Sequence, residues 1–109
     1  MADRARLLDM SGPRTVKEVE ALVFLAARGD PQLEACHRTW LDDDRSWFIR
    51  WREKRDGSPL QIIGLVHAFQ LPEMASRVSL VPFGDEAVPA LRRYAERLKG
   101  ELKAEGFAG

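Results

Sequence analysis

SWFIRWREK, at residues 46–54, alternates Trp, Ile and Trp with Phe, Arg, Arg and Lys. In an extended chain Trp47, Ile49 and Trp51 fall on one side, and the arginines between and beyond them fall on the other. A period of two in a segment rich in aromatic and β-branched residues is typical of a strand with one buried face. We therefore expect a sheet, and the other elements are predicted from how they join this strand.

Two further strands are expected after this one. DGSP at residues 56–59 is a turn sequence, and the nearly all-apolar segment 60–71 predicts a second strand. A second turn at 72–76 leads into a third strand at 77–81, where Pro82 is suited only to an edge position. Three strands joined in this way predict an antiparallel meander.

Two helices are expected before the sheet. Thr15 and Glu18 form a capping-box sequence, and the apolar residues after them keep helical spacing. Gly29 is placed to end this helix in a left-handed conformation. Residues 30–31, Asp-Pro, then predict the start of a second, shorter helix that ends at the acidic run 42–44. The apolar stripe of this second helix would comprise Leu33, Cys36, Trp40 and Leu41.

A long helix is expected after the sheet. Asp85 or Glu86 is the predicted N-cap, Pro89 lies within the first turn, and Gly106 ends the helix. Its apolar stripe would comprise Val88, Leu91, Ala95, Leu98 and Leu102. The predicted fold class is therefore α+β, with two N-terminal helices, a three-stranded antiparallel meander sheet and a long C-terminal helix, in the order ααβββα.

The chain is short enough for one domain, with 109 residues and 12.4 kDa. Residues 1–14 show little pattern and contain SGP at 11–13, a turn or linker signal. We expect a flexible or loosely attached N-terminal segment over residues 1–14 and a single α+β domain over residues 15–109.

The turn at 56–59 also predicts a register. With the turn closed by its two flanking residues, Trp51 lies opposite Gly64. By the same register Trp47 lies opposite Ala68, so that each tryptophan meets a small residue. The core face, covered by the C-terminal helix, would comprise Trp47, Ile49, Trp51, Ile62, Val66, Val78 and Leu80.

The other face of the predicted sheet is also largely apolar, and a strand that is apolar on both faces has to be covered on both. Two alternatives could cover this second face, namely the helix expected near residues 16–26 or a second copy of the protein. Arginines among apolar residues are typical of interfaces. The residues expected to make the contact are Phe48, Arg50, Arg52, Leu65, His67 and Phe69, with the exposed flank of the last helix as second choice.

Composition narrows the function classes. Seventeen basic residues balance 17 acidic ones, which excludes a strongly basic nucleic-acid-binding tail. Cys36 is the only cysteine, so an intramolecular disulfide is impossible and a reducing compartment, the cytoplasm, is expected. The longest apolar run, residues 21–27, is far short of the roughly 20 residues that cross a bilayer, so no membrane partner is expected.

Charge is nevertheless uneven along the chain. Residues 45–55 carry five basic side chains and one acidic residue, Glu53, with three aromatic residues among them. Such a pattern can contact phosphates and stack bases, so a nucleic-acid-binding module that uses residues 45–55 is one alternative. Strand alternation favours a charged, solvated strand instead, because it sends the tryptophans and the arginines to opposite faces.

Two resemblances to known families rest on the order of elements. The order helix, three-stranded meander, helix resembles, in topology only, the double-stranded RNA-binding domain. Such domains open their last helix with lysines that contact phosphates, whereas this chain has GDE at residues 84–86.

A second resemblance covers more of the chain. A short first strand near residues 6–9, two helices, three antiparallel strands and a helix ending in AEGF at 104–107 look like the first two thirds of the GNAT acetyltransferase fold. The DG at 56–57 before the segment 62–66 is similar to that family's second and third strands. Members bind the pyrophosphate of acetyl-CoA through a glycine-rich turn, whose place is taken here by VPFGDEA, with the single glycine Gly84. The resemblance implies a degenerate or partial acetyl-CoA-binding protein.

No catalytic, cofactor-binding or metal-binding residues are predicted. His37 and Cys36, adjacent on an expected helix, would point about 100° apart, and the acidic run 42–44 lacks the glycine and glutamate of a calcium loop. The sequence thus predicts a small cytoplasmic, non-catalytic binding or assembly protein. Its expected partner is a second copy, in a homodimer formed through one sheet face, or another protein.

Overall fold

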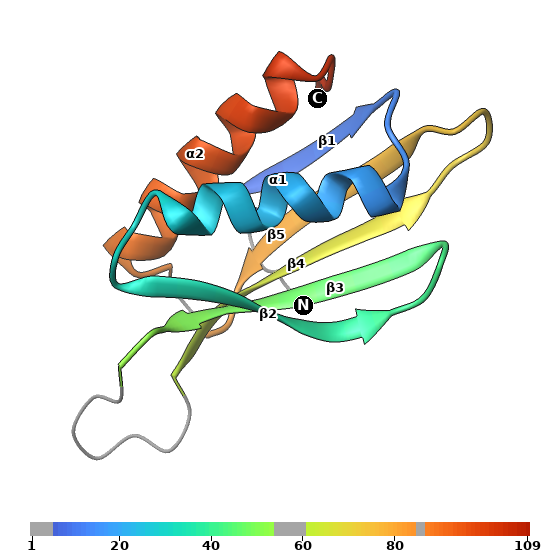
Figure 1. Cartoon of the computed structure of the whole chain (residues 1–109). Helices are drawn as coiled ribbons and strands as arrows, with labels where there is room; N and C mark the ends of the chain where they lie inside the picture. Colours follow the sequence, from blue (N-terminus) through green and yellow to red (C-terminus); the bar gives the residue numbers. More distant parts are fainter. Residues whose placement is uncertain (1–5, 54–60, 85–86) are drawn as a thin grey trace, which may run out of the picture.

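The computed structural model describes residues 6–53, 61–84 and 87–109 of the chain. Within them, one five-stranded sheet is covered by two helices (Figure 1). In chain order the elements are β1 (Leu8–Gly12), α1 (Val16–Arg28), β2 (Leu33–Trp40), β3 (Asp44–Trp51), β4 (Ile62–Gln70), β5 (Ser76–Pro82) and α2 (Pro89–Ala104).

The strands lie in the order β1-β5-β4-β3-β2, and every neighbouring pair is antiparallel. The predicted meander is present as β3, β4 and β5. The predicted arrangement ααβββα is wrong, because the sheet has a further strand at each edge and one helix, not two, precedes the meander. The turn expected at residues 56–59 lies outside the described residues.

The segment expected to form the second helix is the edge strand β2. The Asp30 carboxylate accepts a hydrogen bond from the backbone N–H of Gln32 (2.9 Å), as an N-cap residue would, but the chain then becomes extended. Leu33 is buried and Ala35 packs against the core, so alternate residues face inward. Pairing with β3 and this alternation override the helical spacing of the apolar residues.

Residues 8–12, expected within a loosely attached segment, form the other edge strand, β1. It pairs with β5, and Leu8 and Met10 are buried in the core. The expected domain boundary at residue 15 would therefore remove a strand of the sheet. Near the end of the chain, Ala108 pairs with Ser11 of β1, so the chain end lies beside this edge.

The caps of the helices were predicted in part. The capping box of Thr15 and Glu18 is confirmed, but Gly29 follows α1 in a right-handed conformation (φ −70°). α2 begins from Val88, without a side-chain cap, and not from an acidic N-cap, and Gly106 (φ 92°) follows its end. Neither helix within the described residues is long and apolar enough to cross a bilayer.

Both helices lie on the same face of the sheet (Figure 1). The buried hydroxyl of Tyr94 in α2 donates a hydrogen bond to the carbonyl of Val23 in α1 (2.9 Å), and Arg97 Nε donates one to the carbonyl of Ala26 (3.0 Å). The buried carboxylate of Asp30 lies 3.6 Å from the Arg97 guanidinium. The expectation that α1 covers the second face of the sheet is therefore wrong, because α1 is bound to α2.

The core lies between the helices and the sheet. Trp47, Ile49, Val66, Val78 and Leu80 are fully buried there, as predicted. Two other expected core residues, Trp51 and Ile62, are only half-buried at the ends of their strands.

The observed register of β3 on β4 differs by two residues from the prediction. Trp47 lies opposite Val66, and Ile49, not Trp51, lies opposite Gly64. A shift of two residues leaves the side chains from Trp47 to Ile49 on their predicted faces, because side chains alternate with a period of two. An irregularity follows, and Arg50 pairs with Ile62.

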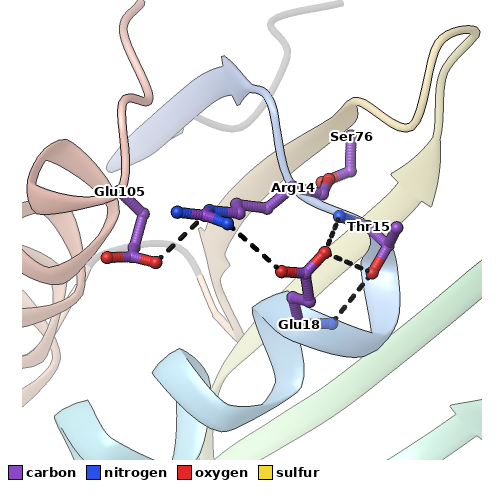
Figure 2. A network of polar contacts seen from close by, with 5 residues as sticks. All are labelled: Arg14, Thr15, Glu18, Ser76 and Glu105. Atoms are coloured by element: carbon purple, nitrogen blue, oxygen red, sulfur yellow. Dashed lines mark hydrogen bonds and ion pairs between the residues drawn. The ribbon is translucent and has the colours of Figure 1, made fainter.

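Arg14, in the loop between β1 and α1, joins three elements (Figure 2). Its guanidinium lies 3.3 Å from Glu105 at the end of α2 and 3.5 Å from Glu18 in the first turn of α1. Its backbone carbonyl accepts a hydrogen bond from the hydroxyl of Ser76 in β5 (2.7 Å). This network holds the start of α1 and the end of α2 on one side of the sheet.

Candidate functional site on the outer sheet face

The outer face is the side of the sheet that points away from α1 and α2. Gly64 and its alternate neighbours Val66 and Ala68 face the helices, because a Cβ on Gly64 would lie 2.5 Å from Leu91 of α2. The residues between them point outward. With their cross-strand partners, they define the outer face as Asp9, Glu34, Cys36, Asp44, Ser46, Phe48, Arg50, Leu65, His67, Phe69, Arg77, Ser79, Val81 and the adjoining Phe83.

An apolar row crosses the middle of the outer face. Cys36 pairs with Phe48, Phe48 with Leu65, and Leu65 with Val81, so that the row spans β2, β3, β4 and β5. All four residues are half-buried. The rings of Phe48 and Phe83 meet edge to face with centroids 6.1 Å apart, and Phe83 is 46% exposed. No helix of the described chain covers this row.

A polar pair lies on the β2 side of the apolar row. Both Nε and Nη2 of Arg50 lie 2.7 Å from Glu34 Oε1. Arg52 Nη1 lies 3.9 Å from the other oxygen of the same carboxylate. Glu34 therefore neutralises part of the positive charge that the basic stretch 45–55 contributes to this face.

A second polar pair lies on the β1 side. Arg77 donates two hydrogen bonds of 2.8 Å to the two carboxylate oxygens of Asp9. These bonds, together with a hydrogen bond from Arg6 and the charges of both arginines, lower the pKa of Asp9 from 3.8 to about 2, against an opposing effect of burial. The pKa of Arg77 is raised in turn by the hydrogen bonds to Asp9. Both partners are thus charged at neutral pH.

His67 occupies a polar row beside the apolar one. Its Nε2 lies 2.8 Å from Asp44 Oδ1, and its ring lies 5.5 Å from that of Phe69. Ser46 and Ser79 are its cross-strand partners on either side. A histidine and carboxylate of this kind can serve as a general base when a nucleophile contacts the ring. In the described part of the chain neither serine hydroxyl is hydrogen-bonded to the histidine, so the arrangement is that of a polar contact.

The six residues singled out from the sequence do not all lie together. Phe48 and Leu65 are direct partners, and His67 and Phe69 continue along β4 on the same face. Arg50 lies at the edge of the apolar row. Arg52 follows β3 and turns to the α1–β2 connection, where it donates hydrogen bonds to the carbonyls of Pro31 (3.2 Å) and Leu33 (2.9 Å).

Four residues of the outer face were not predicted from the sequence. Glu34 and Cys36 were expected in a helix, Asp44 in the acidic run that ends it, and Asp9 in a loosely attached segment. The alternation of LEACH at residues 33–37 was the available signal for β2. The Cys36 thiol donates a weak hydrogen bond to the carbonyl of Phe48 (3.8 Å), and burial raises its pKa, so it is not an activated nucleophile.

The basic stretch does not form a continuous cationic surface. Arg45 is buried on the helix side, where it donates to the carbonyl of Leu41 (2.9 Å) and lies 3.4 Å from Glu20. Arg50 and Arg52 share Glu34. The remaining two basic residues, at positions 54 and 55, lie outside the described residues.

The two resemblances based on element order do not hold in the fold. The double-stranded RNA-binding resemblance assumed only three strands before the last helix. The acetyltransferase resemblance assumed a first strand near residues 6–9, which is present as β1, but also two helices before the meander, where the structure has α1 and the strand β2. Gly84 has a positive φ of 151°, with nothing within 4 Å of a built Cβ, and residues 85–86 lie outside the described residues. Among the described residues no three His, Cys, Asp or Glu side chains gather at a metal-binding distance. Compared with known proteins, the chain matches no family model and no curated sequence.

Proposed function

We propose that this protein is a binding and assembly protein whose outer face pairs with a second copy of the chain. The observation that carries the proposal is the position of both helices on one side of the sheet, so that neither described helix covers the apolar row of Cys36, Phe48, Leu65 and Val81. An apolar centre with charged residues around it is the usual anatomy of a protein interface.

The charge of the outer face favours a second copy over a polyanion. Asp9, Glu34 and Asp44 carry three negative charges, and Arg6, Arg38, Arg50, Arg52 and Arg77, at or beside the face, carry five positive ones, four of which are paired with Asp9 or Glu34. A surface that carries both signs at its edges can complement itself about a twofold axis. Nucleic acid, by contrast, requires an unpaired excess of positive charge, and Arg38 is the one of these five arginines without a carboxylate contact among the described residues.

The outer face is large enough to form a protein interface of standard size. Five strands spaced about 4.8 Å apart, with about seven residues each at about 3.3 Å, give a flat area of about 550 Å². Side chains increase the accessible area above this flat value. A standard interface buries about 800 Å² on each partner, so most of the outer face would take part in the contact.

Sedimentation velocity over a range of protein concentrations tests the proposal. We expect the wild type to form dimers in the micromolar range and Leu65→Lys to remain monomeric, because the substitution places a charge in the middle of the apolar row. Met74→Lys is the matched control, since Met74 is 67% exposed in the β4–β5 turn. It should dimerise like the wild type.

Circular dichroism of Leu65→Lys shows whether the variant is folded, which separates loss of dimer from loss of structure. A wild type that stays monomeric and soluble at high concentration would refute self-association and leave another protein as the partner. The proposal keeps the cytoplasm as the compartment, on the grounds of the single unpaired cysteine.

A further inference from the structure

α1 carries a second apolar stripe on the side that points away from the core. Val16, Val19 and Val23 form its buried stripe, whereas Ala21 and Leu25 are exposed and Phe24 is half-buried. A shallow, open depression of about 490 Å³, called the groove below, lies along this second stripe, and the residues that line it, all from α1, are Lys17, Glu20, Ala21, Phe24, Leu25 and Arg28. These positions recur at three- and four-residue steps, which is the spacing that packs against another helix.

The groove has a positive charge at each end. Glu20 is the acidic residue of the lining. It contacts His37 of β2 and lies 3.4 Å from Arg45 of β3. Lys17 and Arg28 make no ion pair with other described residues. They are eleven residues apart on α1, which corresponds to about 16 Å.

The apolar surface continues from α1 onto β2. The ring of Phe24 lies 5.4 Å from that of His37, and His37 lies 5.6 Å from Trp40. Trp40 is 66% exposed and stacks against the guanidinium of Arg45 (5.5 Å). Because Arg45 is itself bound to Glu20 and to the carbonyl of Leu41, the exposed indole is held in place.

A second copy of this chain is a poor occupant for the groove. An antiparallel pair of α1 helices related by a twofold axis would set Lys17 of one copy beside Arg28 of the other. A parallel pair would set the two copies of Lys17 beside each other, and likewise the two copies of Arg28. Both arrangements bring like charges together.

We infer that the groove on α1 binds an amphipathic helix of another protein, with carboxylates near both ends of its apolar stripe. The apolar side chains of that helix would cover Ala21, Phe24 and Leu25, and its carboxylates would meet Lys17 and Arg28. Recognition of an apolar stripe in a groove is a recurrent way of binding helices. The groove lies on the helix side of the molecule, so this inference does not depend on pairing through the outer face.

Two synthetic helical peptides test the inference on the full chain. They share one apolar stripe and differ only at its ends, where one carries glutamates and the other lysines. Fluorescence anisotropy of labelled peptide measures the affinities. We expect the glutamate peptide to bind about tenfold more tightly, because two solvent-exposed attractions replace two repulsions. Equal affinities, or no binding of either peptide, would overturn the inference.

A charge reversal provides the matched variant. Lys17→Glu combined with Arg28→Glu should invert the preference, so that the lysine peptide binds more tightly. Lys103→Glu, at an exposed position of α2, should leave the preference unchanged. If circular dichroism shows that the double reversal is unfolded, Lys17→Gln with Arg28→Gln replaces it and should make the two affinities equal. A preference that survives these changes contradicts the assigned site.

Anionic lipid vesicles are the second arm of the test. Two free cations provide only a weak attraction to a lipid surface. We therefore expect no sedimentation of the protein with phosphatidylserine vesicles at physiological salt. Strong vesicle binding without discrimination between the peptides would assign the groove to a membrane surface and overturn the proposed helix partner.

Discussion

At the scale of single residues, paired charges set the character of the outer face. Arg77 is fixed by two hydrogen bonds to Asp9, and Arg50 by two contacts to Glu34. An arginine held in this way presents a charge pair, and not a lone cation, to whatever approaches the sheet. This is why a run of basic residues in the sequence does not produce a cationic surface.

Asp9→Asn should remove an acid-sensitive part of the stability. The pKa of Asp9 is lowered to about 2 in the folded state, so its contribution is present above the ordinary value of 3.8 and is lost as the pH falls from there toward 2. Urea unfolding at pH 7, 4 and 2 should show a variant that is less stable than the wild type at pH 7, with a difference that shrinks on acidification. Asp42→Asn, at an exposed position, is the control. A difference that is the same at all three pH values would contradict the role of the ion pair.

At the scale of elements, close contact between α2 and β4 depends on a glycine in the strand. A Cβ on Gly64 would lie 2.5 Å from one methyl group of Leu91 and 3.0 Å from the other. Leu91 is fully buried, so it has no free space into which to move. α2 can therefore pack this closely against β4 only because Gly64 has no side chain.

Gly64→Ala should destabilise the protein by about 1–3 kcal/mol through overpacking, as measured by urea unfolding. In a Leu91→Ala background the same substitution should cost much less, because the clashing methyl groups are gone. Gly100→Ala in α2, where nothing lies within 4 Å, should instead stabilise by about 0.5–1 kcal/mol. If the losses in free energy of unfolding from Gly64→Ala and Leu91→Ala simply add in the double variant, residue 64 and Leu91 are not in contact.

Elements with strong local signals could be predicted from the sequence. α1 has a capping box and a clear apolar period, and β3 and β4 have clear composition and alternation. The outer face was also predicted correctly in its centre, because a register error of two residues keeps Phe48 and Leu65 on the same side.

The edge strands could not be predicted, because tertiary contacts determine them. β1 is five residues long and ends in Ser-Gly, and its burial of Leu8 and Met10 depends on pairing with β5. In β2 an Asp-Pro start and helical apolar spacing gave a consistent but wrong local signal. The choice of which face α1 covers depended on contacts with α2, such as that of Tyr94 with Val23, which have no signature in the sequence.

At the scale of the whole molecule, the two helices and the sheet meet around Tyr94. It is the only tyrosine of the chain, its side chain is completely buried, and its hydroxyl donates to the carbonyl of Val23 (2.9 Å). Burial raises its pKa far above the ordinary value of about 10. The folded protein therefore holds this phenol in its neutral form.

Alkaline titration should consequently report on global unfolding. An unfolded chain ionises its tyrosine near pH 10, so the stability contributed by neutral Tyr94 is lost as the pH rises above this value. We expect the near-ultraviolet absorbance of tyrosinate to rise only together with the loss of the helical circular dichroism signal. Ionisation near pH 10 in a chain that remains helical would contradict the buried position.

In the part of the chain that the structure describes, neither helix covers the outer face, and Cys36 lies within its apolar row. Because Cys36 is the only cysteine, its reaction with a thiol reagent reports on this face alone. Its rate can be measured over the same concentration range as the sedimentation experiment, with the folded Leu65→Lys variant as a reference. Burial of the face in a dimer predicts a rate that falls as the dimer forms in the wild type and stays constant in Leu65→Lys. A wild-type rate that does not change with concentration would contradict pairing through the outer face.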